Sequence, residues 1–231
     1  MGEIWNGTIE AFRLIFTGDS EVGGIVWLSL RVTGAALVFA SIVGIPLGLF
    51  LGLKRFLGRR IVVAMLYTGM GFPPVVVGLF VYLFVSRSGP MGSLAWLFTP
   101  KAMILAQSII SFPLVAGFTM AAVMAVPQEF RQQVRSLGAN QYQIVWAILK
   151  EARVGVLISI IAGFGSIISE VGAVMIVGGN IEGSTRVLTT AIVLEVRKGV
   201  YDLAIALSII LLAISFIVNV AMLRLQGKAF D

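Results

Sequence analysis

The 231-residue sequence contains neither cysteine nor histidine. The absence of cysteine excludes disulfide bonds and thiolate chemistry, and the absence of both residues excludes Cys/His metal sites and histidine proton relays. No Gly-x-x-x-x-Gly-Lys-Ser/Thr pattern is present, so we do not expect the chain to hydrolyse ATP. Because the sequence also offers no nucleophile paired with a general base, it gives little support to a membrane enzyme.

Charged residues are scarce as well: they make up 12% of the chain, whereas hydrophobic residues make up 58%. Five segments have few or no charges and are each about 20 residues or longer, the length needed to cross the roughly 30 Å hydrocarbon layer of a membrane. These segments are 25–53, 61–86, 101–126, 155–177 and 202–223. The sequence therefore predicts an all-α polytopic membrane protein, a single domain with five transmembrane helices.

The net charge of +6 does not indicate a nucleic-acid partner, because the basic residues gather in short loops between the apolar segments. Cytoplasmic loops of membrane proteins carry an excess of Lys and Arg, so we expect residues 54–60 and 127–154 to lie in the cytoplasm. Five spans then put the N-terminus outside, with residues 1–24 as an outer interfacial segment and 178–201 as an outer loop. Residues 4–16 fit either an amphipathic helix on the membrane surface or a short elbow packed on the bundle.

The longest polar interruption, residues 127–154, has the pattern of a helix that starts at Pro127. Three apolar side chains recur at helical spacing and form one stripe: Phe130, Val134 and Leu137. A basic stripe of two arginines lies beside it: Arg131 and Arg135. Gly138 can end this helix in a left-handed conformation, and Asn140 can cap the start of a second helix. The pattern predicts a helix, a glycine corner and a helix, which fits either a protruding contact surface or a loop lying on lipid phosphates.

Small and helix-breaking residues mark two of the predicted spans. Gly44, Gly48 and Gly52 recur every four residues, which is typical of helices that approach each other closely. Pro73 and Pro74 stand side by side within the second span and predict a kink, because neither residue has a backbone N–H to donate.

Glu170 is the only acidic residue deep within a predicted span. A carboxylate at this depth is costly, so we expect it to face protein or water. It can be protonated, bonded to Ser or Gln on neighbouring spans, or paired with an arginine from elsewhere. We favour a structural polar anchor near a dimer interface, because a negative charge on the path of an anion would repel it.

Two stretches resemble a known family. Residues 135–149 (RSLGANQYQIVWAIL) resemble the cytoplasmic loop of ABC-importer permeases, with Gly138 at the position of the family's glycine. Residues 162–181 (AGFGSIISEVGAVMIVGGNI) are similar to the matching stretch of molybdate- and tungstate-type permeases, and most similar to the tungstate branch. Two positions depart from the family pattern: Lys150 and Glu151 replace a Leu-Pro, and Ser166 stands where an arginine is common.

The resemblance implies a type I ABC-importer permease fold in the cytoplasmic membrane of a prokaryote. Two copies of the chain would form the pathway within membrane lipid, and two cytoplasmic ABC ATPases would use ATP and magnesium. An external oxyanion-binding protein would deliver the cargo, tungstate first and molybdate second, and this chain would bind no cofactor or metal. The residues implied in ATPase coupling are Phe130, Arg131, Val134, Arg135, Ser136, Leu137, Gly138 and Ala139. The substrate pathway or gate is expected at Pro73, Pro74, Ser111, Ser169, Glu170 and Gly172.

The competing function is a self-sufficient secondary carrier or channel for a small anion. Such carriers often show two matched halves with broken helices at corresponding positions, and no internal repeat is visible here. An odd number of spans without a repeat favours a subunit that completes its pathway by forming a dimer. A carrier would also work without any ATPase and would tolerate changes at Gly138.

Overall fold

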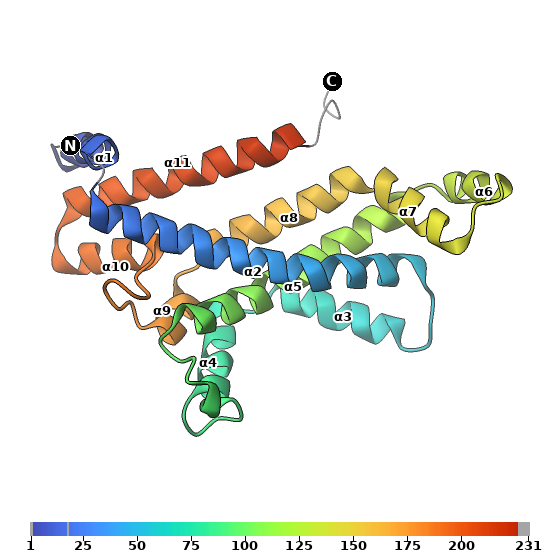
Figure 1. The fold of residues 1–231 in the computed structure, drawn as a ribbon, viewed down its shortest axis with the longest axis horizontal. Coiled ribbons are helices and arrows are strands. Elements are labelled where there is room, and N and C mark those ends of the chain that lie inside the picture. Colours follow the sequence, from blue (N-terminus) through green and yellow to red (C-terminus); the bar gives the residue numbers. More distant parts are fainter. Residues whose placement is uncertain (1, 18, 226–231) are drawn as a thin grey trace.

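The computed structural model describes residues 2–17 and 19–225, and every regular element in that part of the chain is a helix (Figure 1). The elements are α1 (Gly2–Thr17), α2 (Ser20–Leu53), α3 (Arg59–Met70), α4 (Pro74–Val85), the short 3-10 helix η1 (Gly92–Leu94), α5 (Pro100–Ala125), α6 (Gln128–Ser136), α7 (Gln141–Glu151), α8 (Arg153–Ile168), α9 (Gly172–Gly178), α10 (Leu188–Lys198) and α11 (Tyr201–Leu225). Three helices, α2, α5 and α11, are each long and apolar enough to cross a membrane. The number rises to five if the bent pairs α3–α4 and α8–α9 each count as one span.

Helices α2 and α5 pack closely and run in the same direction. A Cβ atom added at Gly44 would lie 3.1 Å from Val115, and one added at Gly52 would lie 2.8 Å from Val123. Between them, a Cβ at Gly48 would overlap the backbone carbonyl of Ala116. The predicted role of the three glycines in close helix packing is confirmed, because only glycine leaves room for the facing backbone.

Helix α8 packs against α5 in the opposite direction. Two hydroxyls meet in this interface, those of Thr119 and Ser159, with 3.0 Å between their oxygens. Nearer the other end of the pair, the Nε2 atom of Gln107 donates to the carbonyl oxygen of Ile167 at 3.0 Å. These buried polar contacts fix the register of the two helices, since a buried donor or acceptor without a partner is costly.

The second predicted span is two helices rather than one kinked helix. Helices α3 and α4 meet at an angle of 102°. Pro73 is the N-cap of α4 and Pro74 its first residue, so the two prolines stand where missing N–H groups cost little. Because α2 and α5 run in parallel, residues 54–99 must carry the chain back across the bundle, and the bent pair makes this crossing.

The predicted span at 155–177 is a bent pair of helices rather than one helix. The chain breaks between Ile168 and Gly172, and α8 and α9 are bent by 60°. The physical reason is a side-chain cap at Glu170, described below. Between α9 and α11 lies only the 11-residue α10, which is too short to cross a membrane.

Helix α1 packs against the first turns of α11. Gly7 allows this contact, since a Cβ there would lie 2.6 Å from Ile205, and Ala11 is buried. The N-terminal segment is therefore a helix packed on the bundle, and the side chains of Trp5 and Ile9 on it remain exposed. Many large apolar side chains of α2, α3, α4 and α11 remain exposed, among them Phe39, Phe80 and Phe216, as expected for a multi-pass integral membrane protein.

Candidate functional site

Helices α6 and α7 form the end of the molecule that lies farthest from α1 and α10 (Figure 1). Pro127 is the N-cap of α6, so the helix starts at Gln128, one residue later than the sequence predicts. Gly138 has a φ of 81°, a left-handed value that suits glycine. Asn140 and Gln143 form a reciprocal capping box at the start of α7. The predicted helix, glycine corner and helix are confirmed as a shape.

The predicted apolar stripe of α6 divides into a buried and an exposed part. Phe130 packs against the buried cluster of Val126 and Ile148, so it anchors α6 to α5 and α7. Val134 is half-buried, and Leu137 is 86% exposed beside the glycine corner. Only the distal end of the stripe is therefore free to contact another molecule.

Two exposed aromatic residues at this end were missed by the sequence reasoning. Tyr142 is 89% exposed and Trp146 is 68% exposed, both on α7. Their signal is the i, i+4 spacing on the face opposite the buried Ile148. Exposed aromatic side chains on a protruding polar loop are typical of a protein contact surface.

The two arginines of α6 have different environments. The Nη2 atom of Arg131 donates to the carbonyl oxygen of Val123 at 2.7 Å and so ties α6 to the last turn of α5. Arg135 is exposed, and no ion pair involves it in the part of the chain that the structure describes. The hydroxyl of Ser136 donates to the carbonyl oxygen of Gln133 within its own helix, and Ala139 is half-buried. Arg131 therefore positions the loop, whereas Arg135 is available to a partner.

The two helix breaks lie against each other, and Pro73 and Ser169 at the breaks are exposed. Gly172 lies against Val75, since a Cβ there would be 2.5 Å from the valine Cγ2 atom. One turn further on, a Cβ at Gly78 would lie 2.6 Å from the Cα atom of Ala173. Beside the first break is a cavity of about 280 Å³, lined by Pro73, Pro74 and neighbouring residues of α4 and α5, with Ser166 of α8. Bent helices with their freed backbone groups thus surround a small space between α3–α4 and α8.

Glu170 caps α9 in this structure. Its Oε1 atom accepts a hydrogen bond from the backbone N–H of Ala173 at 2.9 Å, and its carbonyl oxygen accepts one from the hydroxyl of Thr189 at 2.9 Å. A carboxylate at a helix N-terminus binds the free N–H groups and opposes the positive end of the helix dipole. The side-chain contact is with backbone, not with the Ser, Gln or Arg that the sequence reasoning considered. The signal for this cap is a carboxylate three residues before Ala173, with a glycine between them.

The two serines of the predicted pathway differ in exposure. Ser111 is fully buried, and its hydroxyl donates to the carbonyl oxygen of Gln107 at 2.9 Å. Ser169 is exposed, and its hydroxyl donates to the carbonyl oxygen of Gly165 at 2.9 Å. The structure thus brings Pro73, Pro74, Ser169, Glu170 and Gly172 to the two breaks, and it leaves Ser111 in the core between α5 and α8.

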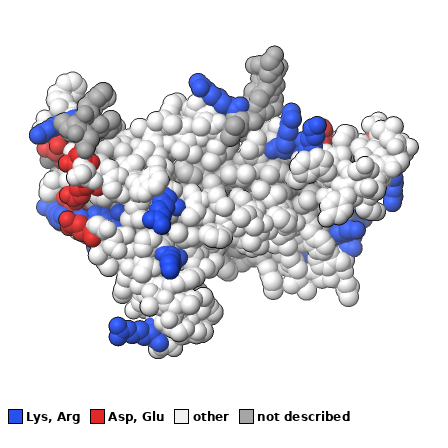
Figure 2. Space-filling model, in the orientation of Figure 1, with Lys and Arg blue, Asp and Glu red and all other residues white. Residues whose placement is uncertain are grey.

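The two ends of the molecule differ in charge. Figure 2 shows acidic side chains gathered at the end that holds α1 and the start of α2, whereas the opposite end, with α6 and α7, carries mainly Lys and Arg. In the described residues, no group of three or more acidic side chains is placed to hold a metal ion. The charge distribution agrees with the pattern from which the cytoplasmic side was predicted.

Comparison with known proteins adds close relatives. A probable anion ABC transporter permease protein of Haloferax volcanii is 44% identical over 209 residues, 88% of this chain and 90% of that protein. The tungstate uptake system permease protein TupB of Peptoclostridium acidaminophilum is 41% identical over 228 residues, 99% of this chain and 100% of that protein. The molybdenum transport system permease protein ModB of Escherichia coli is 28% identical over 174 residues, 72% of this chain and 76% of that protein.

The fold has a match among solved structures. A bacterial ABC transporter involved in the import of the acidic polysaccharide alginate contains a chain that aligns with a TM-score of 0.75 at 20% identity, covering 96% of this chain and 84% of that one. The fold is that of type I ABC-importer permeases. Residues 44–230 match the family described as binding-protein-dependent transport system inner membrane component, so the chain belongs to this family of non-catalytic ABC-transporter permease subunits.

Proposed function

We propose that this permease subunit carries a tetrahedral oxyanion, tungstate first and molybdate second, into the cell. The main support for tungstate as the cargo is the 41% identity to a tungstate uptake permease along the full length of both chains. The molybdenum permease is more distant, at 28% identity over 72% of this chain.

The proposed transporter contains two copies of this chain, two ABC ATPases and an external binding protein, in the cytoplasmic membrane of a prokaryote. The N-terminus lies outside, and α6 and α7 lie in the cytoplasm, where the ATPases bind ATP and magnesium. Support comes from the family and from the positive charge at the α6–α7 end.

The coupling surface in this proposal is the distal part of the loop: Leu137, Gly138, Arg135, and the aromatic side chains of Tyr142 and Trp146. Leu137 and both aromatic residues are more than two-thirds exposed, so they have no structural role in the isolated chain that would explain them. Phe130, Arg131 and Val134 support this surface from behind, and Ser136 and Ala139 shape the corner.

The proposed pathway passes the two breaks, at Pro73–Pro74 and at 169–172. An anion that must be released again needs weak donors, and freed backbone N–H groups and exposed hydroxyls such as that of Ser169 are weak donors. Glu170 serves there as a cap rather than as a ligand. Ser111 is reached by cargo only if α5 and α8 separate.

Reconstitution in proteoliposomes tests the function. Vesicles that contain this chain, its ATPase and a tungstate-loaded binding protein should accumulate tungstate only when ATP is supplied to the ATPase side. Omitting the ATPase is the matched control. Uptake without the ATPase would support the secondary carrier instead. If tungstate, molybdate and sulfate-loaded binding proteins all fail to stimulate ATP hydrolysis, the importer assignment is wrong.

A further inference from the structure

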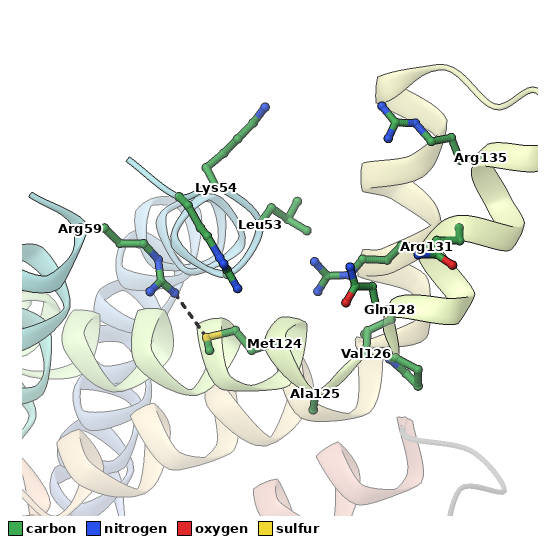
Figure 3. A pocket seen from close by; sticks show the side chains of 13 residues that line it. Leu53, Lys54, Arg59, Met124, Ala125, Val126, Gln128, Arg131 and Arg135 are labelled. Atoms are coloured by element: carbon green, nitrogen blue, oxygen red, sulfur yellow. Dashed lines mark hydrogen bonds between the residues drawn. The ribbon is translucent and has the colours of Figure 1, made fainter. Parts of the chain in front are cut away.

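A cleft of about 710 Å³ lies at the α6–α7 end of the molecule, between the end of α2, the end of α5 and α6 (Figure 3). Five basic side chains line it: Lys54, Arg55, Arg59, Arg131 and Arg135. No Asp or Glu is among the described residues that line it. A concave surface with charge of one sign concentrates ions of the opposite sign, so the cleft attracts anions.

Two of these arginines are held in place by the helices around them. The Nε atom of Arg59 donates to the carbonyl oxygen of Leu51 at 2.8 Å, and Arg131 donates to that of Val123 at 2.7 Å. Both acceptors belong to the last turn of a helix, where carbonyl groups lack partners within the helix and the dipole favours cations. The two guanidinium groups are therefore fixed before any ligand arrives.

Hydrogen-bond donors remain free in the cleft. A guanidinium group has five N–H donors, and the bond from Arg131 to Val123 is made by the Nη2 atom alone. Within residues 2–17 and 19–225, none of the ion pairs includes a side chain of the cleft. Fixed arginines with free donors match the geometry of phosphate oxygens.

Exposed apolar side chains stand next to the positive cleft. Phe50 and Phe56 contact each other with their ring centroids 5.4 Å apart, and both rings are partly exposed. Leu57 is fully exposed, and Ile61 is 63% exposed at the start of α3. A second cleft, of about 570 Å³, is lined by these loop residues and shares Arg55 and Arg59 with the first. A free inorganic ion makes no favourable contact with this apolar surface. A phospholipid has both a phosphate for the basic cleft and acyl chains for the apolar side chains.

We propose that the cleft binds the phosphate of an anionic phospholipid, whose acyl chains lie along the exposed apolar side chains of α2 and α3. Basic pockets between transmembrane helices are suited to such headgroups. Because Arg131 ties α6 to α5 from within the cleft, the bound lipid would hold α6 in place from below the bilayer surface. The proposal does not depend on the cargo.

Lipid binding to the purified full chain in detergent tests the proposal, with native mass spectrometry as the readout. The probes are phosphatidylglycerol, cardiolipin and phosphatidylcholine, together with inorganic phosphate and tungstate as free ions. Phosphatidylglycerol should bind to the double variant Arg59→Gln/Arg131→Gln about twenty-five-fold more weakly than to the original chain, because each lost basic charge contributes roughly a fivefold factor. Arg153→Gln is the matched control, since Arg153 is an exposed cation at the start of α8 outside the cleft.

A second pair keeps the test informative if the first variant folds poorly. Lys54→Gln/Arg55→Gln removes two cleft charges whose side chains make no hydrogen bond within the described residues, so folding should be unaffected. Unchanged phosphatidylglycerol binding in both double variants, or an equal loss in Arg153→Gln, overturns the proposal. Equal binding of phosphate or tungstate without lipid would show a free-ion site instead. Displacement of the lipid by added ATPase would show that the cleft is an ATPase contact. The test measures lipid binding and not transport, so a negative result would not contradict the proposed function.

Discussion

Glu170 is expected to act through an oxygen atom rather than through its charge. Its Oε1 atom accepts the N–H of Ala173 at the start of α9, and α9 has only 7 residues, so its dipole is small. Glu170→Gln keeps an oxygen in the same place and removes the charge. Glu170→Ala removes both, so the two variants separate the cap from the charge.

The expected costs follow from the two contributions. Loss of a side-chain cap destabilises a protein by about 1 kcal/mol, within a range of roughly 0.5–2. Loss of a charge at a helix N-terminus costs about 0.3–1 kcal/mol, and the short helix puts this case at the lower end. We therefore expect Glu170→Gln to lower the free energy of unfolding by about 0.3 kcal/mol. Glu170→Ala should lower it by about 1–2 kcal/mol, because Ala also leaves an N–H group without a partner.

Thermal unfolding in detergent and tungstate uptake in proteoliposomes measure the two effects. Glu170→Gln should melt within a degree or so of the original chain and keep most of its uptake, whereas Glu170→Ala should melt about 2–8 °C lower. Ser169→Ala is the control for the melting temperature only, since the Ser169 hydroxyl bonds back to the carbonyl oxygens of Gly165 and Ser166 in its own helix. If the Gln variant is as impaired as the Ala variant, a negative charge is required and the cap is not the function of this residue.

Three further outcomes follow from the structure. Gly138→Ala should weaken ATPase binding, measured by co-purification, through about 1–2 kcal/mol of left-handed strain. Gly183→Ala, with a φ of 69° and nothing within 4 Å, carries the same strain in the loop between α9 and α10 and should leave binding intact. Trp146→Ala should reduce ATPase affinity about thirtyfold, as for an exposed aromatic anchor worth roughly 2 kcal/mol, without lowering the melting temperature, and a wild-type affinity would exclude it from the contact. Gly48→Ala should destabilise the bundle, because its new methyl group overlaps the backbone of α5, whereas Gly34→Ala on the same helix meets nothing within 4 Å and should be neutral or stabilising.

Features that depend on residues close in sequence were predictable. The corner at Gly138 and the cap at Asn140 are each set by one residue and its immediate neighbours, and both are confirmed. The spans 101–126 and 202–223 agree with α5 and α11 to within two residues at each end, because length and apolar composition decide them. Helix α2 begins five residues earlier than predicted, since Asp19 accepts hydrogen bonds from the N–H groups of Glu21 and Val22.

Features that depend on the surroundings were not predictable in the same way. The hydropathy of residues 155–177 predicts one apolar span. Hydropathy does not register the side-chain cap at Glu170, after which a new helix runs in another direction. It also cannot show that Ser111 is buried, because its exposure is decided by α8 packing on α5. The predicted pathway residues were chosen for their chemistry, and the structure separates those near the breaks from one in the core.

The parallel packing of α2 and α5 determines how the bent pair α3–α4 must be interpreted. A bend of 102° is compatible with a re-entrant loop that returns to the side from which it came. Such a loop would make α2 and α5 antiparallel, since the chain would start α5 at the end where α2 stopped. The contacts of Gly44 with Val115 and of Gly52 with Val123 show that α2 and α5 are parallel, because the residue numbers of both helices increase in the same direction along the interface. The pair therefore crosses the bundle, so the loop at 54–58 and the α6–α7 loop lie at the same end, and the positive cleft between them faces a single membrane surface.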